Sequence, residues 1–312
     1  MWDADGHRYL DALGEFTAGI YGHSEPAIRA AITEALAGGL SLSSHTTREG
    51  ALAREVQRRF PGMELLRFTN SGTEAVECAL KTARKFHVAN GQPERIDIYG
   101  FDGSFHGRTY GAINAAANPS YTEGFGPKME GFHQLKWGDH DAIKAAIANP
   151  TTAAIIVEPV AGNMNLIKPQ PGFLEGLRRV CTQYGAVLIF DEVMTGFRVG
   201  PQGVQGLYGV TPDLTTLGKV IGGGMPVAAF GGKRDIMNSV APLGPVYQAG
   251  TLSGNPVAVT CGLATLHEIQ QPGFYKRLSE QTAKLVKGLG AMAKKHGVAF
   301  SAQSIGGMFG IY

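Results

Sequence analysis

Residues 186–224 read AVLIFDEVMTGFRVGPQGVQGLYGVTPDLTTLGKVIGGG, and this stretch decides the fold. It begins with an apolar run, Ala186–Phe190, that ends on Asp191. A continuous apolar run of this length is typical of a strand buried on both faces, as in a parallel sheet flanked by helices. A carboxylate at the carboxyl end of such a strand lies where open α/β sheets bind ligands.

The same kind of run recurs along the chain and alternates with helical patterns. The candidate strands are Leu65–Thr69, Ile96–Phe101, Ala153–Glu158, Ala186–Asp191 and Val227–Gly231. Helical periodicity marks Ile28–Ala37, Glu49–Phe60, Glu74–His87, Asp141–Ala148, Phe173–Tyr184, Pro256–Ile269 and Gly273–Lys295. This alternation predicts an α/β fold with a mainly parallel sheet.

Composition narrows the class of protein. The chain has 312 residues, of which 44% are hydrophobic and 17% charged, as in globular proteins. A net charge of +2 gives no reason to expect nucleic acid or a membrane as a partner. Its three cysteines lie far apart and no two histidines have H-x-x-x-H spacing, so we expect no disulfide framework, no metal site and a cytoplasmic location.

Lys219 is the second chemically informative residue. It lies between the apolar segment that ends at Leu217 and a run of three glycines, Gly222–Gly224. Burial lowers the pKa of an amine and makes it a nucleophile that can form a Schiff base with an aldehyde. A lone buried lysine is nevertheless more often structural than catalytic, so Lys219 needs supporting residues.

A third motif joins a strand to a helix. In the run FTNSGTEA, Ser71 and Glu74 have the S-x-x-E spacing of a capping box, and the turn through Gly72 and Thr73 presents N–H groups to an anion. Helix capping alone would also explain it. The chain has no G-x-G-x-x-G after its first strand, which disfavours a nicotinamide-dependent oxidoreductase.

Together, a phosphate cradle, a strand-end acid and a nucleophilic lysine are what pyridoxal 5′-phosphate requires. The phosphate needs a helix N-terminus, the ring nitrogen needs a carboxylate, and the aldehyde needs an amine. Glu158 also ends a predicted strand at the same rim, where a structural and a functional role are equally supported.

The motifs resemble the class III aminotransferases, which are fold type I pyridoxal-phosphate enzymes, and the resemblance covers essentially the whole chain. Residues 186–224 carry it most specifically. Within the class, VEPVAGN (157–163), DLTTLGKVIGGG (213–224) and GPVYQAGTLSGNP (244–256) resemble the glutamate-1-semialdehyde 2,1-aminomutases. The middle block, from Cys78 to Phe132 with its SFHGRT motif, instead resembles acetylornithine-type aminotransferases.

The resemblance implies a role for each matching residue. Lys219 forms the Schiff base and moves the substrate proton, and Asp191 pairs with the ring nitrogen. The remaining implied cofactor contacts are Ser71, Gly72 and Thr73 to the phosphate, Phe105 and Val193 to the two ring faces, His106 beside Phe105, and Asn163 near the 3′-oxygen. Thr251 is expected to reach the cofactor of the neighbouring subunit, which implies a homodimer.

The resemblance also implies an organisation. We expect a seven-stranded, mixed but mainly parallel sheet in a cofactor-binding large domain, residues 51–266. Residues 1–50 would form an N-terminal segment of the small domain, and residues 267–312 the start of a truncated C-terminal small domain.

Three functions follow from these patterns. The first is a glutamate-1-semialdehyde 2,1-aminomutase, favoured by the second half of the chain. The second is an acetylornithine or ω-amino acid:2-oxo acid transaminase, favoured by the middle block. In the aminomutases the corresponding position holds a loop that gates the site, and here the acetylornithine-type segment replaces that loop. The third is a non-catalytic fragment that keeps the cradle. The substrate of either enzyme is a small amino or oxo acid.

Overall fold

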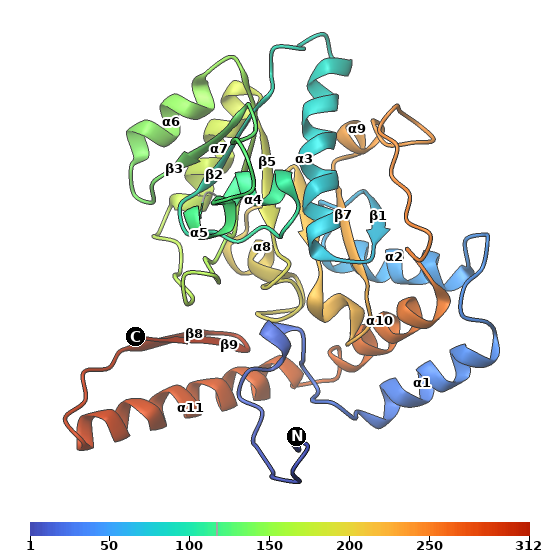
Figure 1. Cartoon of the computed structure of the whole chain (residues 1–312), viewed down its shortest axis with the longest axis vertical. Helices are drawn as coiled ribbons and strands as arrows, with labels where there is room; N and C mark the ends of the chain where they lie inside the picture. The colour runs from blue at the N-terminus through green and yellow to red at the C-terminus, as the bar shows by residue number, and fades with distance from the viewer. Residues whose placement is uncertain (117) are drawn as a thin grey trace.

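The computed structural model describes residues 1–116 and 118–312 and is built on one seven-stranded sheet (Figure 1). The strand order is β1-β7-β6-β5-β4-β2-β3. The strands are β1 (Leu65–Thr69), β2 (Asp97–Phe101), β3 (Phe132–Leu135), β4 (Thr152–Val157), β5 (Val187–Asp191), β6 (Leu214–Leu217) and β7 (Ala228–Gly232). Strands β3, β2, β4, β5 and β6 are parallel neighbours, whereas β7 runs antiparallel to β6 and β1. The predicted mixed, mainly parallel sheet is confirmed.

Helices cover both faces of the sheet, which explains the continuous apolar runs. The helices are α1 (Pro26–Ala37), α2 (Thr47–Arg59), α3 (Gly72–Ala89), α4 (Tyr110–Ala116), α5 (Pro119–Thr122), α6 (His140–Ala148), α7 (Phe173–Tyr184), α8 (Gly203–Tyr208), α9 (Arg234–Met237), α10 (Pro256–Glu268) and α11 (Phe274–Lys295). Ile156 and Ile189 pack with α3, whereas their neighbours in the chain, Ile155 and Leu188, pack with α6 and α7. Successive residues of a strand point to opposite faces, so both sets must be apolar.

A third cluster lies where the sheet meets α2 and α10. Leu52 and Val56 of α2 pack with Val259 and Leu266 of α10 against Leu217 at the end of β6. This packing fixes the segment that carries Lys219, because Lys219 follows Leu217 by two residues and begins the short 3-10 helix Lys219–Gly222.

Two of the seven strands, β3 and β6, were not predicted as strands from the sequence. β3 reads FHQL and pairs only with β2, at one end of the sheet. β6 reads LTTL and is buried despite two threonines. Their hydroxyls are paired: Thr215 accepts from Gln205, and Thr216 donates to Asp191. Hydrogen bonding therefore lets a polar pair occupy a central strand.

The chain ends lie away from the sheet. Helix α11 and the hairpin β8 (Ala302–Ile305) and β9 (Met308–Ile311) extend below it beside the N-terminal segment (Figure 1). The predicted boundaries after residues 50 and 266 fall inside α2 and α10 and remain predictions. None of the described helices is both long and apolar enough to cross a membrane.

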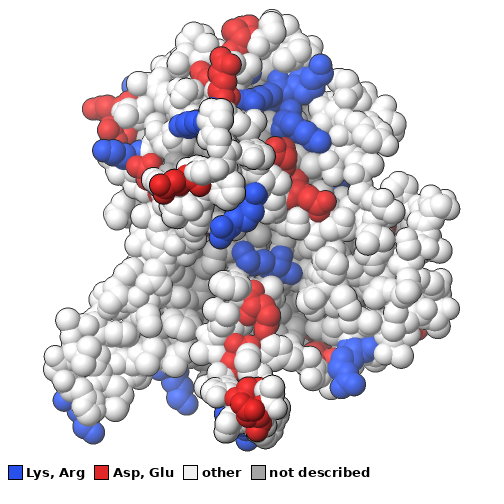
Figure 2. Space-filling view, viewed as in Figure 1, with Lys and Arg blue, Asp and Glu red and all other residues white. Residues whose placement is uncertain are grey.

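Charges are mixed on the face that Figure 2 shows. Lys and Arg lie among Asp and Glu on a surface that is mostly uncharged (Figure 2). On this face of the described residues there is therefore no extended field of one sign that would steer a highly charged partner.

Candidate active site

A cavity of about 200 Å³ lies at the carboxyl ends of the central strands. Asp191 ends β5, and Glu158 directly follows β4. The lining residues are Ser71, Gly72, Thr73, Phe105, His106, Gly107, Glu158, Val160, Asp191, Val193, Met194 and Lys219. The structure thus brings together all the predicted site residues except Asn163 and Thr251.

Both carboxyl oxygens of Asp191 have hydrogen-bond partners. Its side chain is 4% exposed. Oδ1 accepts from the Val193 N–H at 3.0 Å and from the Thr216 hydroxyl at 3.1 Å. Oδ2 lies 2.7 Å from Nδ1 of His106, whose side chain is fully buried. The carboxylate therefore joins β5 to β6 and to the loop that carries His106.

His106 has an unsatisfied atom. Its Nε2 is buried and has no hydrogen-bond partner among the described residues. Nδ1 is occupied by Asp191, so Nε2 is the ring nitrogen that remains available to a partner. A buried polar atom without a partner requires an explanation, and a ligand or water in this cavity supplies one.

Lys219 has a strained backbone and a perturbed amine. Its φ is +52°, a region that residues other than glycine rarely occupy, and such strain clusters at functional sites. Burial lowers the pKa of Lys219, while the carboxylates of Asp191 and Glu158 act in the opposite direction. Removal of the amine from water is the larger effect, which favours the neutral, nucleophilic form.

The N-terminus of α3 forms one wall of the cavity. Ser71 caps it, because its Oγ accepts from the Glu74 N–H at 3.2 Å. The Glu74 carboxylate accepts from the Asn70 N–H at 2.7 Å, so the reciprocal bond of the predicted capping box is displaced by one residue. The first-turn N–H groups of Gly72 and Thr73 have no acceptor among the described residues, and both residues line the cavity, where their N–H groups could bind an anion.

Two glycines in this wall have no room for a side chain. A Cβ on Gly72 would lie 2.8 Å from Cγ1 of Val193. Gly107 has a φ of +117°, and a Cβ there would lie 2.4 Å from Oγ1 of Thr73. Close packing therefore holds the helix N-terminus, the Val193 side chain and the Phe105–Gly107 loop against one another. The sequence did not single out Gly107, although its place in the SFHG run is a signal.

Phe105 is held from two sides. Its N–H donates to Oε1 of Glu158 at 2.6 Å, and its ring meets Tyr121 edge-on at 5.8 Å. The Arg108 guanidinium lies over both rings, 5.0 Å from Phe105 and 4.4 Å from Tyr121. The middle block thus builds an aromatic and cationic cluster around Phe105, which lines the cavity.

Asn163 and Thr251 are not in the lining of the cavity. The Asn163 amide donates to the Gly103 carbonyl at 2.8 Å. Thr251 is exposed in a turn that Asn70 contacts through a 3.1 Å hydrogen bond to Ser253. Their predicted contacts to cofactor remain predictions.

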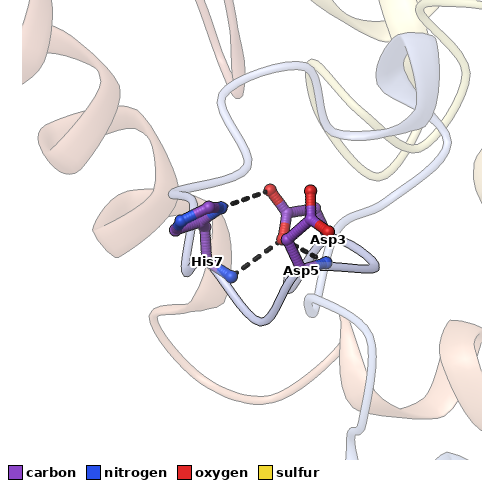
Figure 3. A group of neighbouring side chains, drawn as sticks. All are labelled: Asp3, Asp5 and His7. Carbon is purple, nitrogen blue, oxygen red and sulfur yellow. Dashed lines mark hydrogen bonds and ion pairs between the residues drawn. The ribbon is translucent and has the colours of Figure 1, made fainter.

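Two clusters of acidic residues and histidine occur in the N-terminal segment. One consists of Asp3, Asp5 and His7, the other of Asp11, Glu15 and His23. In the first, the Asp3 carboxylate accepts from the N–H groups of Asp5 and His7 and faces the His7 ring at 3.1 Å (Figure 3). These are the contacts of a turn in an exposed hairpin and do not by themselves define an ion site.

The residues present fit the group that the resemblance implies. The free N–H groups at α3 suit a phosphate, the buried Asp191–His106 pair suits a protonated ring nitrogen, and Lys219 suits an aldehyde. Phe105 and Val193, which the resemblance assigns to the two ring faces, both line the cavity.

Comparison with known proteins agrees with this chemistry. The model of the class III aminotransferase family matches residues 1–312. The glutamate-1-semialdehyde 2,1-aminomutase of Bordetella avium is 52% identical over 322 aligned positions, which cover all of this chain and 74% of that protein. Among solved structures, a β-phenylalanine aminotransferase from Variovorax paradoxus is 42% identical, with a TM-score of 0.88 over 100% of this chain and 70% of its own. An amine transaminase from an uncultivated Pseudomonas species, solved with PLP bound, is 28% identical, with a TM-score of 0.87 over 98% and 76% of the two chains.

The lowered pKa of Lys219 has a consequence that does not depend on any cofactor. As the pH rises, an amine with a lowered pKa becomes neutral earlier than an ordinary lysine, and only the neutral amine is acylated. We expect the pH profile for acetylation of Lys219 in the apoprotein to lie at lower pH than that of the lysine of a model peptide added to the same sample. Peptide mass spectrometry at a series of pH values measures both profiles in one sample. Coincident profiles would contradict the perturbed amine.

Proposed function

Because the chain belongs to the class III aminotransferases, we propose that it moves amino groups between small amino and oxo acids with Lys219 and Asp191 as its catalytic residues. The cofactor of this family of enzymes is pyridoxal 5′-phosphate. One observation carries the proposal: a single cavity holds the buried Asp191 carboxylate, the Lys219 amine with its lowered pKa, and the open N-terminus of α3.

Each group has a defined task in this proposal. When bound, the cofactor withdraws electrons from the substrate Cα. Asp191 holds the proton on the ring nitrogen, and His106 orients Asp191 through their 2.7 Å contact. The N–H groups of Gly72 and Thr73 bind the phosphate, and Phe105 and Val193 confine the ring.

Lys219 has two tasks at different times. Its neutral amine would hold the aldehyde of the bound cofactor. When it is free of the aldehyde, the same amine would take up the substrate proton and return it. Desolvation favours this role, since a lowered pKa increases the share of Lys219 that is neutral and able to accept a proton.

We propose glutamate-1-semialdehyde as the substrate, with internal transfer of the amino group. The 52% identity to the Bordetella aminomutase supports this choice. An ω-amino acid:2-oxo acid transaminase is the second candidate. The 42% identity to the β-phenylalanine aminotransferase and the Phe105–Arg108–Tyr121 cluster favour it.

Supplying the semialdehyde alone separates these two candidates. A mutase converts it to 5-aminolevulinate without a co-substrate, whereas a transaminase turns over only with an amino donor and an oxo acid together. We expect product from the semialdehyde alone with wild-type protein loaded with pyridoxal 5′-phosphate, none with Lys219→Ala, and a rate lower by orders of magnitude with Asp191→Asn. Turnover only with donor–acceptor pairs would support the transaminase. Near-normal turnover by Asp191→Asn would contradict its assigned role.

We further propose a cytoplasmic homodimer in which Thr251 contacts the neighbouring subunit's cofactor. Three buried free cysteines support a reducing compartment. Tyr247 and Leu252, on the segment that carries Thr251, are largely exposed, which supports a contact between subunits.

Mixed dimers test the action of Thr251 in trans. In a dimer of Lys219→Ala and Thr251→Ala subunits, one site has both Lys219 and a partner that keeps Thr251. At limiting cofactor, we expect the mixed dimer to recover activity that neither parent shows. If Thr251 acts within its own subunit, no site is complete and no activity returns.

A further inference from the structure

Glu158 links two loops that border the cavity. Its side chain is buried and lines the cavity wall. Oε1 accepts from the Phe105 N–H at 2.6 Å. Oε2 accepts from the N–H groups of Gly162 at 2.8 Å and Asn163 at 3.1 Å. One carboxylate thus bonds the loop that precedes α4 and the loop that follows β4.

The Phe105 loop has a second anchor on the neighbouring strand. His106, the next residue, contacts Asp191 at the end of β5, while Phe105 contacts Glu158 just after β4. The two carboxylates therefore fix adjacent residues of one loop from adjacent parallel strands. Asp191 has other partners in Val193 and Thr216, whereas among the described residues the Glu158 side chain bonds only these two loops.

We propose that Glu158 is a positioning residue that sets the Phe105 ring against the cofactor by accepting the Phe105 N–H and the Gly162 and Asn163 N–H groups with separate oxygens. This inference rests on the proposed function, since it takes the cavity to be the cofactor site. All three backbone groups are donors and both carboxyl oxygens accept, which favours the ionised form, whereas burial raises the pKa of Glu158 and acts in the opposite direction.

The geometry predicts why glutamine cannot replace Glu158. A glutamine has one accepting oxygen, and its NH₂ group would point at an N–H donor. Either the Phe105 N–H or the Gly162 and Asn163 N–H groups would then be buried without an acceptor. Aspartate keeps the charge but is one methylene shorter, so it cannot reach both loops at these distances.

Titration of the apoprotein with pyridoxal 5′-phosphate tests the proposal. We expect Glu158→Gln to weaken binding about tenfold or more, because a buried N–H loses its acceptor. Visible circular dichroism of the bound cofactor should change as well, since it reports the asymmetric setting of the ring.

Asp213→Asn is the matched control: Asp213 is also a buried carboxylate that accepts a backbone N–H, from Leu188, but it lies outside the cavity lining. It should lower the temperature of unfolding and leave the dichroism of the bound cofactor unchanged.

A double-mutant cycle separates positioning from general loosening. In a Phe105→Leu background, the aromatic ring is absent, so Glu158→Gln should weaken cofactor binding by a clearly smaller factor than in the wild-type background. Equal factors in the two backgrounds would overturn the proposal.

Further outcomes keep the test decisive. If Glu158→Gln fails to fold, Glu158→Asp takes its place, with weaker binding and altered dichroism expected. A folded Glu158 variant with the affinity and dichroism of the wild type would overturn the positioning role while leaving the proposed function intact. A wild-type apoprotein that takes up no pyridoxal 5′-phosphate would contradict the proposed function itself, and the inference about Glu158 with it.

Discussion

A buried carboxylate requires hydrogen-bond partners, and those of Asp191 come from three different parts of the chain. The bond from Val193 fixes the loop after β5, the bond from Thr216 fixes β6, and the contact with His106 fixes the loop before α4. Leaving a buried charge unpaired costs far more than one of these bonds contributes. The arrangement of the cavity walls therefore depends on satisfying this one group.

The sheet explains why the other functional groups arrive at the same place. Parallel strands end at a common edge, so Glu158 and Asp191 meet there, and Lys219 follows β6 at that edge. Strand β1 lies next to β7 at one end of the sheet and is followed in the chain by α3, whose N-terminus lines the cavity. Small residues complete the assembly: Gly72 lets Val193 pack against the helix, and Gly107 lets its loop lie on Thr73.

Much of this arrangement was predictable from the sequence because it rests on local signals. Apolar runs located β1, β2, β4, β5 and β7, and the Ser71–Glu74 spacing located the start of α3. The short strands β3 and β6 were not predicted, because their polar residues interrupt the apolar pattern. The burial of Thr215 and Thr216 is explained by tertiary hydrogen bonds, which the sequence does not show. The hydrogen bond between the Phe105 N–H and Glu158 could not be predicted either, because the two residues lie far apart in the sequence. A local pattern could show that Glu158 ends a strand but not which N–H groups it accepts.

The central claim is that the Asp191 cavity holds pyridoxal 5′-phosphate with its aldehyde at Lys219. The most direct measurement is borohydride reduction of the purified protein after addition of the cofactor, followed by peptide mass mapping. We expect a stable pyridoxyl adduct on the peptide that contains Lys219, and its absence when Lys219 is replaced by alanine. A protein that takes up the cofactor but carries the adduct on other lysines, or carries none, would contradict the account.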